Sequence, residues 1–402
     1  MASFTETPSR SSYDVVIVGG AIVGSAIAWF IASDPGFDGS VLVVERDPSY
    51  GACSTAHTNS CMRQQFSSPL NVLISQFAAD YIKNFRSLMD DNPDVPDIDT
   101  HNFGYLYLAG DNKFASVLKT NQELQRGLGA GTEILSPQQI GERYPFYNLD
   151  DIVCGSLNLI DEGYFDSGVM FEQWRRMARL RGVEYTRGEV VEMIRDGDVV
   201  GGVVLHSGIT ISCGTVVNAA GPRAASVAAM AGIDLPVEPR KRFTFVFEAA
   251  RSCGHNVPLT IDPSGVHVRS DGTVYMAGCA PDQDDRVSPD DFEMDHEIWE
   301  NKVWPAIAHR IPAFDQVKLV TRWAGHYAYN PFDHNAIVGP HPEICNFVFA
   351  NGFSGHGVQQ SPAIGRGVAE IVIHGRYTTL DLTPLGYKRI ANNQPVTESA
   401  VI

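Results

Sequence analysis

Residues 13–45 read YDVVIVGGAIVGSAIAWFIASDPGFDGSVLVVE. A largely apolar run at 14–18 predicts a buried parallel strand, the glycine-rich turn 19–24 leads into a helix, and a second strand at 41–44 ends at Glu45. Such a turn lets the backbone approach a pyrophosphate at the helix N-terminus, and an acid about 20 residues further on accepts from a ribose hydroxyl. The stretch therefore predicts a βαβ unit that binds a dinucleotide.

This fingerprint departs from the usual pattern at one position. Ala21 stands where the middle glycine is expected, so a methyl group lies at the closest approach of the pyrophosphate, where a small shift can accommodate it. Glu45, rather than a basic residue, ends the second strand. An acid at this point argues against a 2′-phosphate and therefore against NADP.

Length and composition predict a globular protein of two domains. The chain has 402 residues, of which 44% are hydrophobic and 19% charged, and its net charge is −17. This charge disfavours nucleic acid and acidic membrane surfaces as partners, whereas a local cationic pocket can still bind a small anionic substrate. The longest apolar stretch, 15–32, is interrupted by glycines, so no membrane span is expected. Scattered cysteines without a C-x-x-C pair, and histidines without metal spacing, favour a reducing, cytoplasmic location and no metal.

A second glycine-rich turn, NGFSGHG at 351–357, lies between a predicted strand and a predicted helix, far from the first turn in the sequence. We therefore expect one discontinuous nucleotide domain with another domain inserted. Between 236 and 322, short strands separated by turns such as Asp271-Gly272 predict an antiparallel sheet. The predicted architecture is a Rossmann-like α/β nucleotide domain (12–90, 150–233 and 326–390), an antiparallel β substrate domain (91–149 and 234–325) and a disordered leader (1–11).

Three further motifs carry a resemblance to a known family. They are DEGYFD at 161–166, TVVNAAG at 215–221 and GFSGHG at 352–357. With the N-terminal unit, they make the chain similar to the D-amino acid oxidase superfamily of flavoproteins, in the branch of the sarcosine oxidase β-type enzymes. The resemblance implies FAD as the cofactor and a fold of the glutathione reductase or D-amino acid oxidase type.

The resemblance also implies which residues contact FAD. The pyrophosphate should meet Gly19, Ala21 and Gly24, and the adenosine ribose should meet Glu45. The other expected contacts are Arg46, Ser54, Thr55, His57, Val190, Ala220, Gly221, Gly325, Gly352, Gly355, His356, Gly357, Val358 and Gln359.

Three departures from the family's pattern bear on the flavin. The segment 324–327 holds no thiol where relatives attach the flavin through a cysteine, and Ala56 replaces a tryptophan beside His57. We therefore expect FAD to be bound non-covalently. Gln359 follows Val358 where the family has a lysine that activates oxygen. Cationic help near the flavin must then come from elsewhere, or oxygen is not the natural electron acceptor.

Oxidation of an amine next to a carboxylate needs groups that desolvate the amine, fix the carboxylate and stabilise negative charge on the flavin. Strand alternation puts Lys241 and Arg242 on opposite faces, so one of them should face the cleft, and puts His267 and Arg269 on the same face. The alternatives are an ion pair between domains for Arg63, a solvated strand edge for the strand cations, and a core position for Tyr327. The catalytic candidates are Arg63, Lys241, His267, Arg269 and Tyr327.

These features predict FAD-dependent oxidation of the C–N bond of a secondary amino acid. Hydride transfer to flavin N5 gives an imine, water hydrolyses it to an amine and an oxoacid, and O2 reoxidises the flavin. A substrate with two carboxylates, such as iminodiacetate, is favoured over a sarcosine-like one by the cations Arg63, Lys241 or Arg242, Arg269 and Arg322.

Two alternatives stay open. One is a dehydrogenase that passes electrons to a quinone or a flavoprotein. The other is an assembly factor without turnover, because the chain also resembles mitochondrial FAD-dependent oxidoreductase-domain proteins implicated in respiratory-complex assembly, and a fold alone does not fix a function. The sequence does not predict an oligomeric state.

Overall fold

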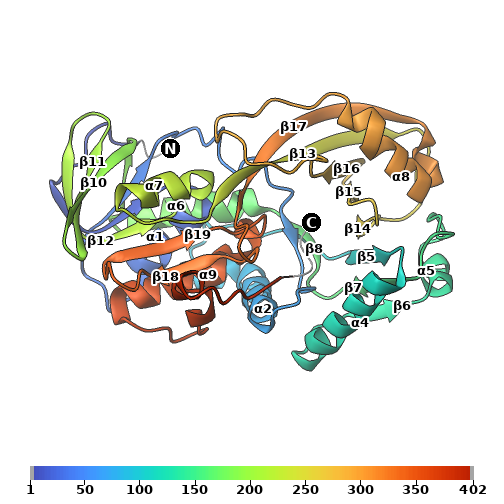
Figure 1. Cartoon of the computed structure of the whole chain (residues 1–402), viewed down its shortest axis with the longest axis horizontal. Helices are drawn as coiled ribbons and strands as arrows, with labels where there is room; N and C mark the ends of the chain where they lie inside the picture. The colour runs from blue at the N-terminus through green and yellow to red at the C-terminus, as the bar shows by residue number, and fades with distance from the viewer. Residues whose placement is uncertain (1–3, 399–402) are drawn as a thin grey trace.

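The computed structural model describes residues 4–398, which form two sheet-based domains side by side along the longest axis of the molecule (Figure 1). The sheet of the nucleotide domain consists of β1 (Ser12–Val18), β2 (Val41–Glu45), β9 (Glu184–Arg187), β10 (Val190–Asp196), β11 (Val199–Leu205), β12 (Thr210–Asn218), β18 (Ile337–Pro340) and β19 (Phe347–Asn351). Its order is β10-β11-β12-β1-β2-β9, with β19 beside β12 and β18 beside β19. β1 is parallel to β2 and to β12, which is the strand arrangement that the first 45 residues predict.

Helices bury both faces of the parallel strands. Val15 and Ile17 face a cluster that contains Trp29 and Trp174, whereas the alternate residues of β1 face a second cluster with α7 (Ala224–Met230). On the first face, α1 and α9 approach so closely that a Cβ on Gly365 would lie 2.7 Å from the Cβ of Ala26. The helices on that face are α1 (Ile22–Ser33), α2 (Pro69–Lys83), α3 (Phe85–Leu88), α6 (Ser167–Leu180) and α9 (Gly357–His374).

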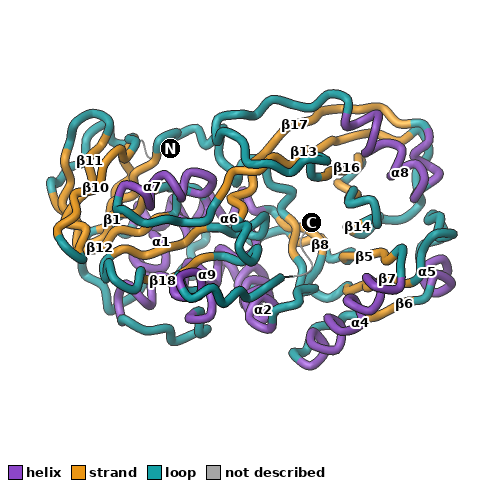
Figure 2. The backbone as a smooth tube through the Cα atoms, viewed as in Figure 1, coloured by secondary structure: helices purple, strands orange, loops and turns teal. Residues whose placement is uncertain are grey.

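The substrate domain is a second, mainly antiparallel sheet in the order β17-β13-β16-β15-β14-β5-β7-β6 (Figure 2). Phe245, Phe247 and Phe314 are buried on one of its faces together with Trp299. Its strands are β5 (Tyr105–Ala109), β6 (Glu133–Leu135), β7 (Cys154–Asn158), β13 (Glu238–Ala249), β14 (Leu259–Ile261), β15 (His267–Asp271), β16 (Val274–Cys279) and β17 (Val317–Tyr329). The helices of this domain are α4 (Asn112–Gly127), α5 (Pro137–Arg143), η2 (Trp299–Val303), α8 (Trp304–Arg310) and η3 (Pro312–Asp315).

A small sheet connects the two domains. It consists of β3 (Cys61–Met62), β8 (Gly163–Phe165) and β4 (Thr100–His101), in the order β3-β8-β4. Gly163 has φ +146°, and a Cβ at this position would lie 1.9 Å from the carbonyl oxygen of His101, so this position requires glycine. The remaining short helices are η1 (Gly221–Arg223), η4 (Thr383–Leu385) and α10 (Lys388–Ala391).

The structure confirms the mixed α/β fold and corrects three details of the prediction. β7 pairs with β5, so the first substrate-domain segment extends past residue 149 to Asn158. β17 continues to Tyr329 because it pairs with β13 along its length, so the last nucleotide-domain segment does not begin at 326. Residues 4–11 of the expected disordered leader lie against β9, where Thr5 bridges Thr186, while residues 1–3 fall outside the described part.

Candidate active site

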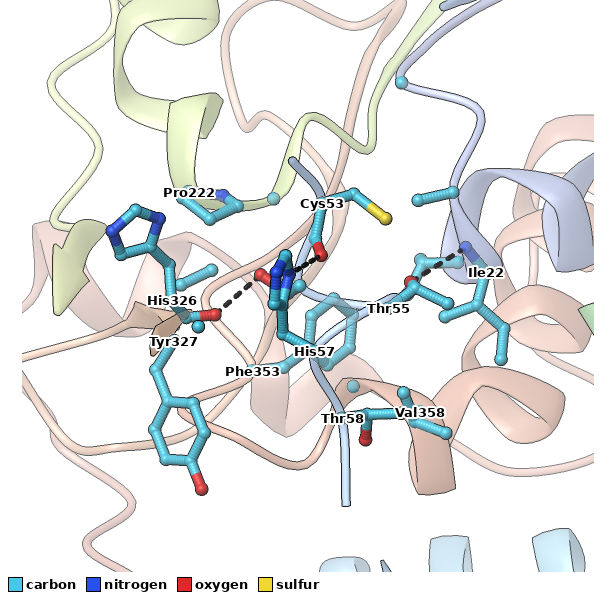
Figure 3. Close-up of a pocket in the computed structure, with 18 of the residues that line it drawn as sticks. Ile22, Cys53, Thr55, His57, Thr58, Pro222, His326, Tyr327, Phe353 and Val358 are labelled. Atoms are coloured by element: carbon cyan, nitrogen blue, oxygen red, sulfur yellow. Dashed lines mark hydrogen bonds between the residues drawn. The ribbon is translucent and has the colours of Figure 1, made fainter. Parts of the chain in front are cut away.

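A deep pocket lies between the two domains and begins at the carboxyl ends of β1 and β2. β1 has parallel neighbours on both sides, so this is the point of an α/β sheet at which nucleotides bind. From there the pocket runs past the turn after β19 to the inner surface of β13 and β17. Figure 3 shows how residues from distant segments, among them Ile22, His57, Pro222, Tyr327 and Val358, surround one space.

The nucleotide half of the pocket has the features that the first turn predicts. Gly19 has φ +98°, and a Cβ on it would lie 2.5 Å from the carbonyl oxygen of Ala219, so a side chain is excluded there. Glu45 lines the pocket and accepts hydrogen bonds from the backbone amides of Gly20 and Asp47, each at 2.8 Å. Burial raises the pKa of Glu45, and these two amides oppose that effect.

All the predicted cofactor residues except Gly24 and Gly352 line this pocket. Gly24 packs against the first turn, because its Cβ would lie 1.9 Å from the carbonyl oxygen of Gly19. Gly352 has φ +69°, a backbone conformation that glycine adopts without strain. Both glycines shape the turns beside the pocket rather than its surface.

The pocket residues fit FAD. An acid lies at the end of β2 for a ribose, and glycine turns at both ends of the groove leave backbone exposed for close approach. At the inner end, a Cβ on Gly355 would lie 2.4 Å from the ring of Tyr327, and one on Gly325 would lie 2.7 Å from the Cβ of His57. These glycines let the backbone pack closely against Tyr327 and His57, which line the pocket.

The loop 52–58 forms one wall of the pocket and is fixed by hydrogen bonds (Figure 3). The hydroxyl of Thr55 accepts from the amide of Ile22 at 3.3 Å, and the hydroxyl of Ser54 donates to the carbonyl of His326 at 2.6 Å. His57 donates from Nδ1 to the carbonyl of Cys53 at 3.0 Å, since a carbonyl can only accept. Its ring stacks on Phe292 with a centroid distance of 5.3 Å.

Arg63 is buried at the inner end of the pocket. Its Nη2 lies 2.7 Å from Nε2 of His356, and its guanidinium lies 4.0 Å from the ring centre of Phe66. Because arginine only donates, Nε2 of His356 accepts and its proton is on Nδ1. Burial, together with the charge of Arg63, lowers the pKa of His356 well below its usual value, so this imidazole is neutral.

Gln359, which stands at the lysine position of the related family, fixes the backbone of Arg63. Its Oε1 accepts from the amide of Arg63 at 3.0 Å, and its Nε2 donates to the carbonyl of Arg63 at 2.7 Å. Nε2 also donates to the hydroxyl of Ser75 at 2.6 Å. The side chain thus holds the segment that carries Arg63.

On the substrate-domain wall, Arg242 and not Lys241 lines the pocket. The guanidinium of Arg242 binds both oxygens of Asp284, at 2.7 and 2.9 Å, and lies 4.6 Å from the ring centre of Tyr327. Lys241 points away and pairs with Asp291 at 2.6 Å. The alternation that the sequence predicts is present, and it removes Lys241 from the catalytic candidates.

His267 and Arg269 share a face, as predicted, but only His267 is among the pocket residues. Asn59 contacts both residues. Its side-chain Nδ2 donates to Nε2 of His267 at 3.1 Å, and its backbone carbonyl accepts from Nη2 of Arg269 at 3.2 Å. Burial lowers the pKa of His267 to about 4, with contributions from nearby arginines, so it is neutral. Arg269 pairs with Asp271 at 2.9 Å and stacks on Tyr164, so it lies behind the pocket wall.

Several pocket residues had no signal in the sequence. The side-chain oxygen of Asn59 also accepts from the hydroxyl of Thr244 at 3.3 Å. Asn59 thus connects several side chains of the pocket wall, and no sequence motif predicts these contacts. Tyr105 and Leu259 line the same end of the pocket from β5 and β14. Tyr105 lies at the start of β5, and the direction of its side chain depends on how that strand joins the sheet.

The fold and this pocket define a flavoprotein oxidoreductase of the two-domain type. The chain belongs to the FAD dependent oxidoreductase (DAO) family, whose model matches residues 14–371. Its cofactor is therefore FAD, and it is an FAD-dependent amine or amino acid oxidoreductase. The predictions of family, cofactor and enzyme class are confirmed.

The relatives are similar along nearly the whole chain. FAD-dependent oxidoreductase domain-containing protein 1 of Xenopus laevis is 37% identical over 98% of this chain and 85% of its own length. Mitochondrial sarcosine dehydrogenase of Homo sapiens is 25% identical over 92% of this chain and 40% of its own length. Among solved structures, L-proline dehydrogenase from P. horikoshii has a TM-score of 0.83 and 26% identity, covering 96% of this chain and 100% of that one.

None of the helices within residues 4–398 has both the length and the apolar character needed to cross a membrane. The cytoplasmic location stays a prediction.

Proposed function

We propose that this protein oxidises the C–N bond of a small secondary amino acid that carries one carboxylate. The observation that supports this most is Arg242, a cation on the pocket wall beside Tyr327, at the inner end of the FAD site. The side chain of Arg242 is only 12% exposed, so solvent screens its charge weakly. A substrate carboxylate in the pocket would gain from this nearby positive charge.

The same charges argue against the two-carboxylate substrate that the sequence favoured. That prediction counted cations without their partners. Lys241, Arg242 and Arg269 each have an aspartate within ion-pair distance. Arg322 is exposed and is not among the pocket residues. No positive charge among these four residues is therefore left over for a second carboxylate. An N-alkyl glycine or a cyclic secondary amino acid fits better than iminodiacetate.

The surroundings favour the neutral form of the substrate amine, which carries the electron pair that the oxidation needs. His267 and His356 are neutral, and their Nε2 atoms already accept from Asn59 and Arg63, so neither is left to accept from an ammonium group. Tyr105 and Leu259 add apolar surface, and the buried Arg63 adds a positive charge. When bound, FAD accepts a hydride from the carbon next to nitrogen, and water then hydrolyses the imine that is released.

Anaerobic mixing of the FAD-loaded protein with secondary amino acids tests this proposal. The panel contains sarcosine, N-ethylglycine, L-proline and iminodiacetate, and the readout is loss of the yellow flavin absorbance. We expect bleaching by at least one monocarboxylate and slower bleaching by iminodiacetate. A flavin that stays oxidised with the whole panel, in a protein with full FAD content, would overturn the proposal and favour an assembly role.

A dehydrogenase is the second candidate, and Gln359 favours it. The amide of Gln359 is engaged with Arg63 and Ser75, and it brings no cation to the position where the related family has lysine. We therefore infer slow reoxidation by O2. Mixing the reduced protein with O2 or with a soluble quinone measures both rates, and a faster reaction with O2 would favour the oxidase.

A further inference from the structure

We propose that Asp284 determines the specificity of this pocket for substrates with one carboxylate. The inference rests on the proposed function, because it concerns the same site. Asp284 belongs to an acidic strap, residues 281–293 (PDQDDRVSPDDFE), which joins β16 to the helical segment before α8. The strap runs along β13 and β17 at the top of the view in Figures 1 and 2.

The strap places carboxylates on cations of both domains. Asp290 pairs with Arg223 and lies 3.6 Å from Arg46, both of which line the nucleotide half of the pocket. Asp291 pairs with Lys241 at 2.6 Å, outside the pocket. Of these strap carboxylates, that of Asp284 is the one bound to a cation of the substrate wall.

The pair between Asp284 and Arg242 occupies one edge of the guanidinium. Asp284 binds Nη1 and Nη2 in a bidentate arrangement, and Nη1 also donates to the carbonyl of Lys241 at 2.7 Å. The side chains of Arg242 and Asp284 are only 12% and 28% exposed, so solvent screens this pair weakly. Nε is buried in the protein, so a ligand would meet Arg242 through the part of the side chain that lines the pocket.

This arrangement admits one carboxylate and opposes a second. A single substrate carboxylate can meet the part of Arg242 that lines the pocket while Asp284 keeps its bidentate pair. A second carboxylate on the same ligand would lie near the negative charge of Asp284, or would have to displace it from a bidentate pair. Both outcomes weaken the binding of dicarboxylates relative to monocarboxylates.

Asp284→Asn tests the proposal because it removes the charge and keeps the shape. Acetate and malonate serve as probes, and their dissociation constants are measured from the change that each causes in the absorption spectrum of the bound flavin. We expect the variant to bind malonate more tightly relative to acetate by about tenfold or more. The ratio of kcat/KM for iminodiacetate to that for sarcosine should rise in the same direction.

Asp285→Asn is the matched control. Asp285 is the next residue of the strap, it is exposed, and it forms no ion pair among the described residues, so its variant has the same net charge without touching Arg242. We expect its malonate-to-acetate ratio to stay within twofold of wild type. An unchanged ratio in Asp284→Asn, or an equal rise in both variants, overturns the proposal.

Two further measurements keep the result decisive. If Asp284→Asn does not retain FAD, Asp284→Ser removes the same charge with a smaller side chain, and the same ratio is measured. Anion binding needs no turnover, so the role of Asp284 is tested even if no amino acid reduces the flavin. If no amino acid reduces the flavin, the proposed function is wrong, and the malonate-to-acetate ratio still tests the role of Asp284.

Discussion

Nη2 of Arg63 donates to Nε2 of His356 at 2.7 Å, so a cation and a neutral imidazole share the buried inner end of the FAD pocket. The two residues are 293 positions apart in the sequence. Gln359, three residues after His356 in α9, fixes the backbone of Arg63. The turn after β19 and the helix that follows it therefore hold both the guanidinium and the backbone of Arg63.

Arg63→Gln should lower kcat/KM of the bleaching substrate by about 2–4 kcal/mol, or roughly 30- to 1000-fold, with FAD content unchanged. The reason is the loss of a buried positive charge where negative charge develops during oxidation. Arg63→Lys should recover only part of the activity, because lysine lacks the planar fork that reaches His356. Stopped-flow reduction kinetics measure both variants, and wild-type rates in Arg63→Gln would remove Arg63 from the site.

Arg242→Met and Lys241→Met form a matched pair on neighbouring positions of β13. Arg242 lines the pocket and Lys241 does not, so the first change should cost about 2–4 kcal/mol in kcat/KM and the second under about 0.5 kcal/mol. The variants lose the same charge, so a general electrostatic effect would lower both. An equal loss in the two variants would contradict the assignment of the wall.

Glu45→Ala should weaken FAD binding by about 1.5–3 kcal/mol, or roughly ten- to a hundredfold in Kd. The change removes the proposed ribose acceptor, and it also leaves the amides of Gly20 and Asp47 without their acceptor. Flavin released on dilution, followed by fluorescence, gives the Kd. Unchanged affinity would show that Glu45 serves only the turn.

Acid precipitation of the polypeptide should leave FAD in the supernatant. No thiol lies at 324–327, and His57 is held by the carbonyl of Cys53 and by Phe292 as a loop residue. A yellow pellet would mean a covalent bond, and peptide mass analysis would then begin at His57.

Glu162 should make the free energy of unfolding depend on pH. It is fully buried and accepts from the amide of Gln64 and the side chains of Gln65 and Asn158. Burial raises its pKa from 4.5 to about 7, against these hydrogen bonds, so the folded state binds more protons between these values than the unfolded state. Stability is then highest below pH 4.5 for this group and falls on the order of 3 kcal/mol as the pH rises to 7.

Urea unfolding of wild type and Glu162→Gln across this range measures the effect. The difference in unfolding free energy between the two proteins should change with pH in this window and be constant above it. Glu123→Gln, at an exposed site on α4, is the control and should keep the wild-type slope. A constant difference between wild type and Glu162→Gln would show that Glu162 does not titrate there.

The sequence by itself determined the features that depend on neighbouring residues. The βαβ unit at 13–45 and the turn at 351–357 lie where the patterns predict them. A strand, a helix and a glycine turn each depend on residues that are close together in the sequence. The spacing of hydrophobic residues and the position of glycines can therefore predict them. The family resemblance added FAD and most of the residues expected to contact it, because those residues lie on the same local motifs.

Only the tertiary structure decided which charges are left for a substrate. Alternation required Lys241 and Arg242 to face opposite ways, but the pairing of β13 with β17 and the course of the strap chose Arg242 for the pocket. Asp284, 42 positions away, pairs with Arg242 through a contact without any local signal. The energy of an electrostatic interaction depends on the distance between the charges and on their burial. Folding brings together residues that are far apart in the sequence, so their sequence separation predicts neither the distance nor the burial.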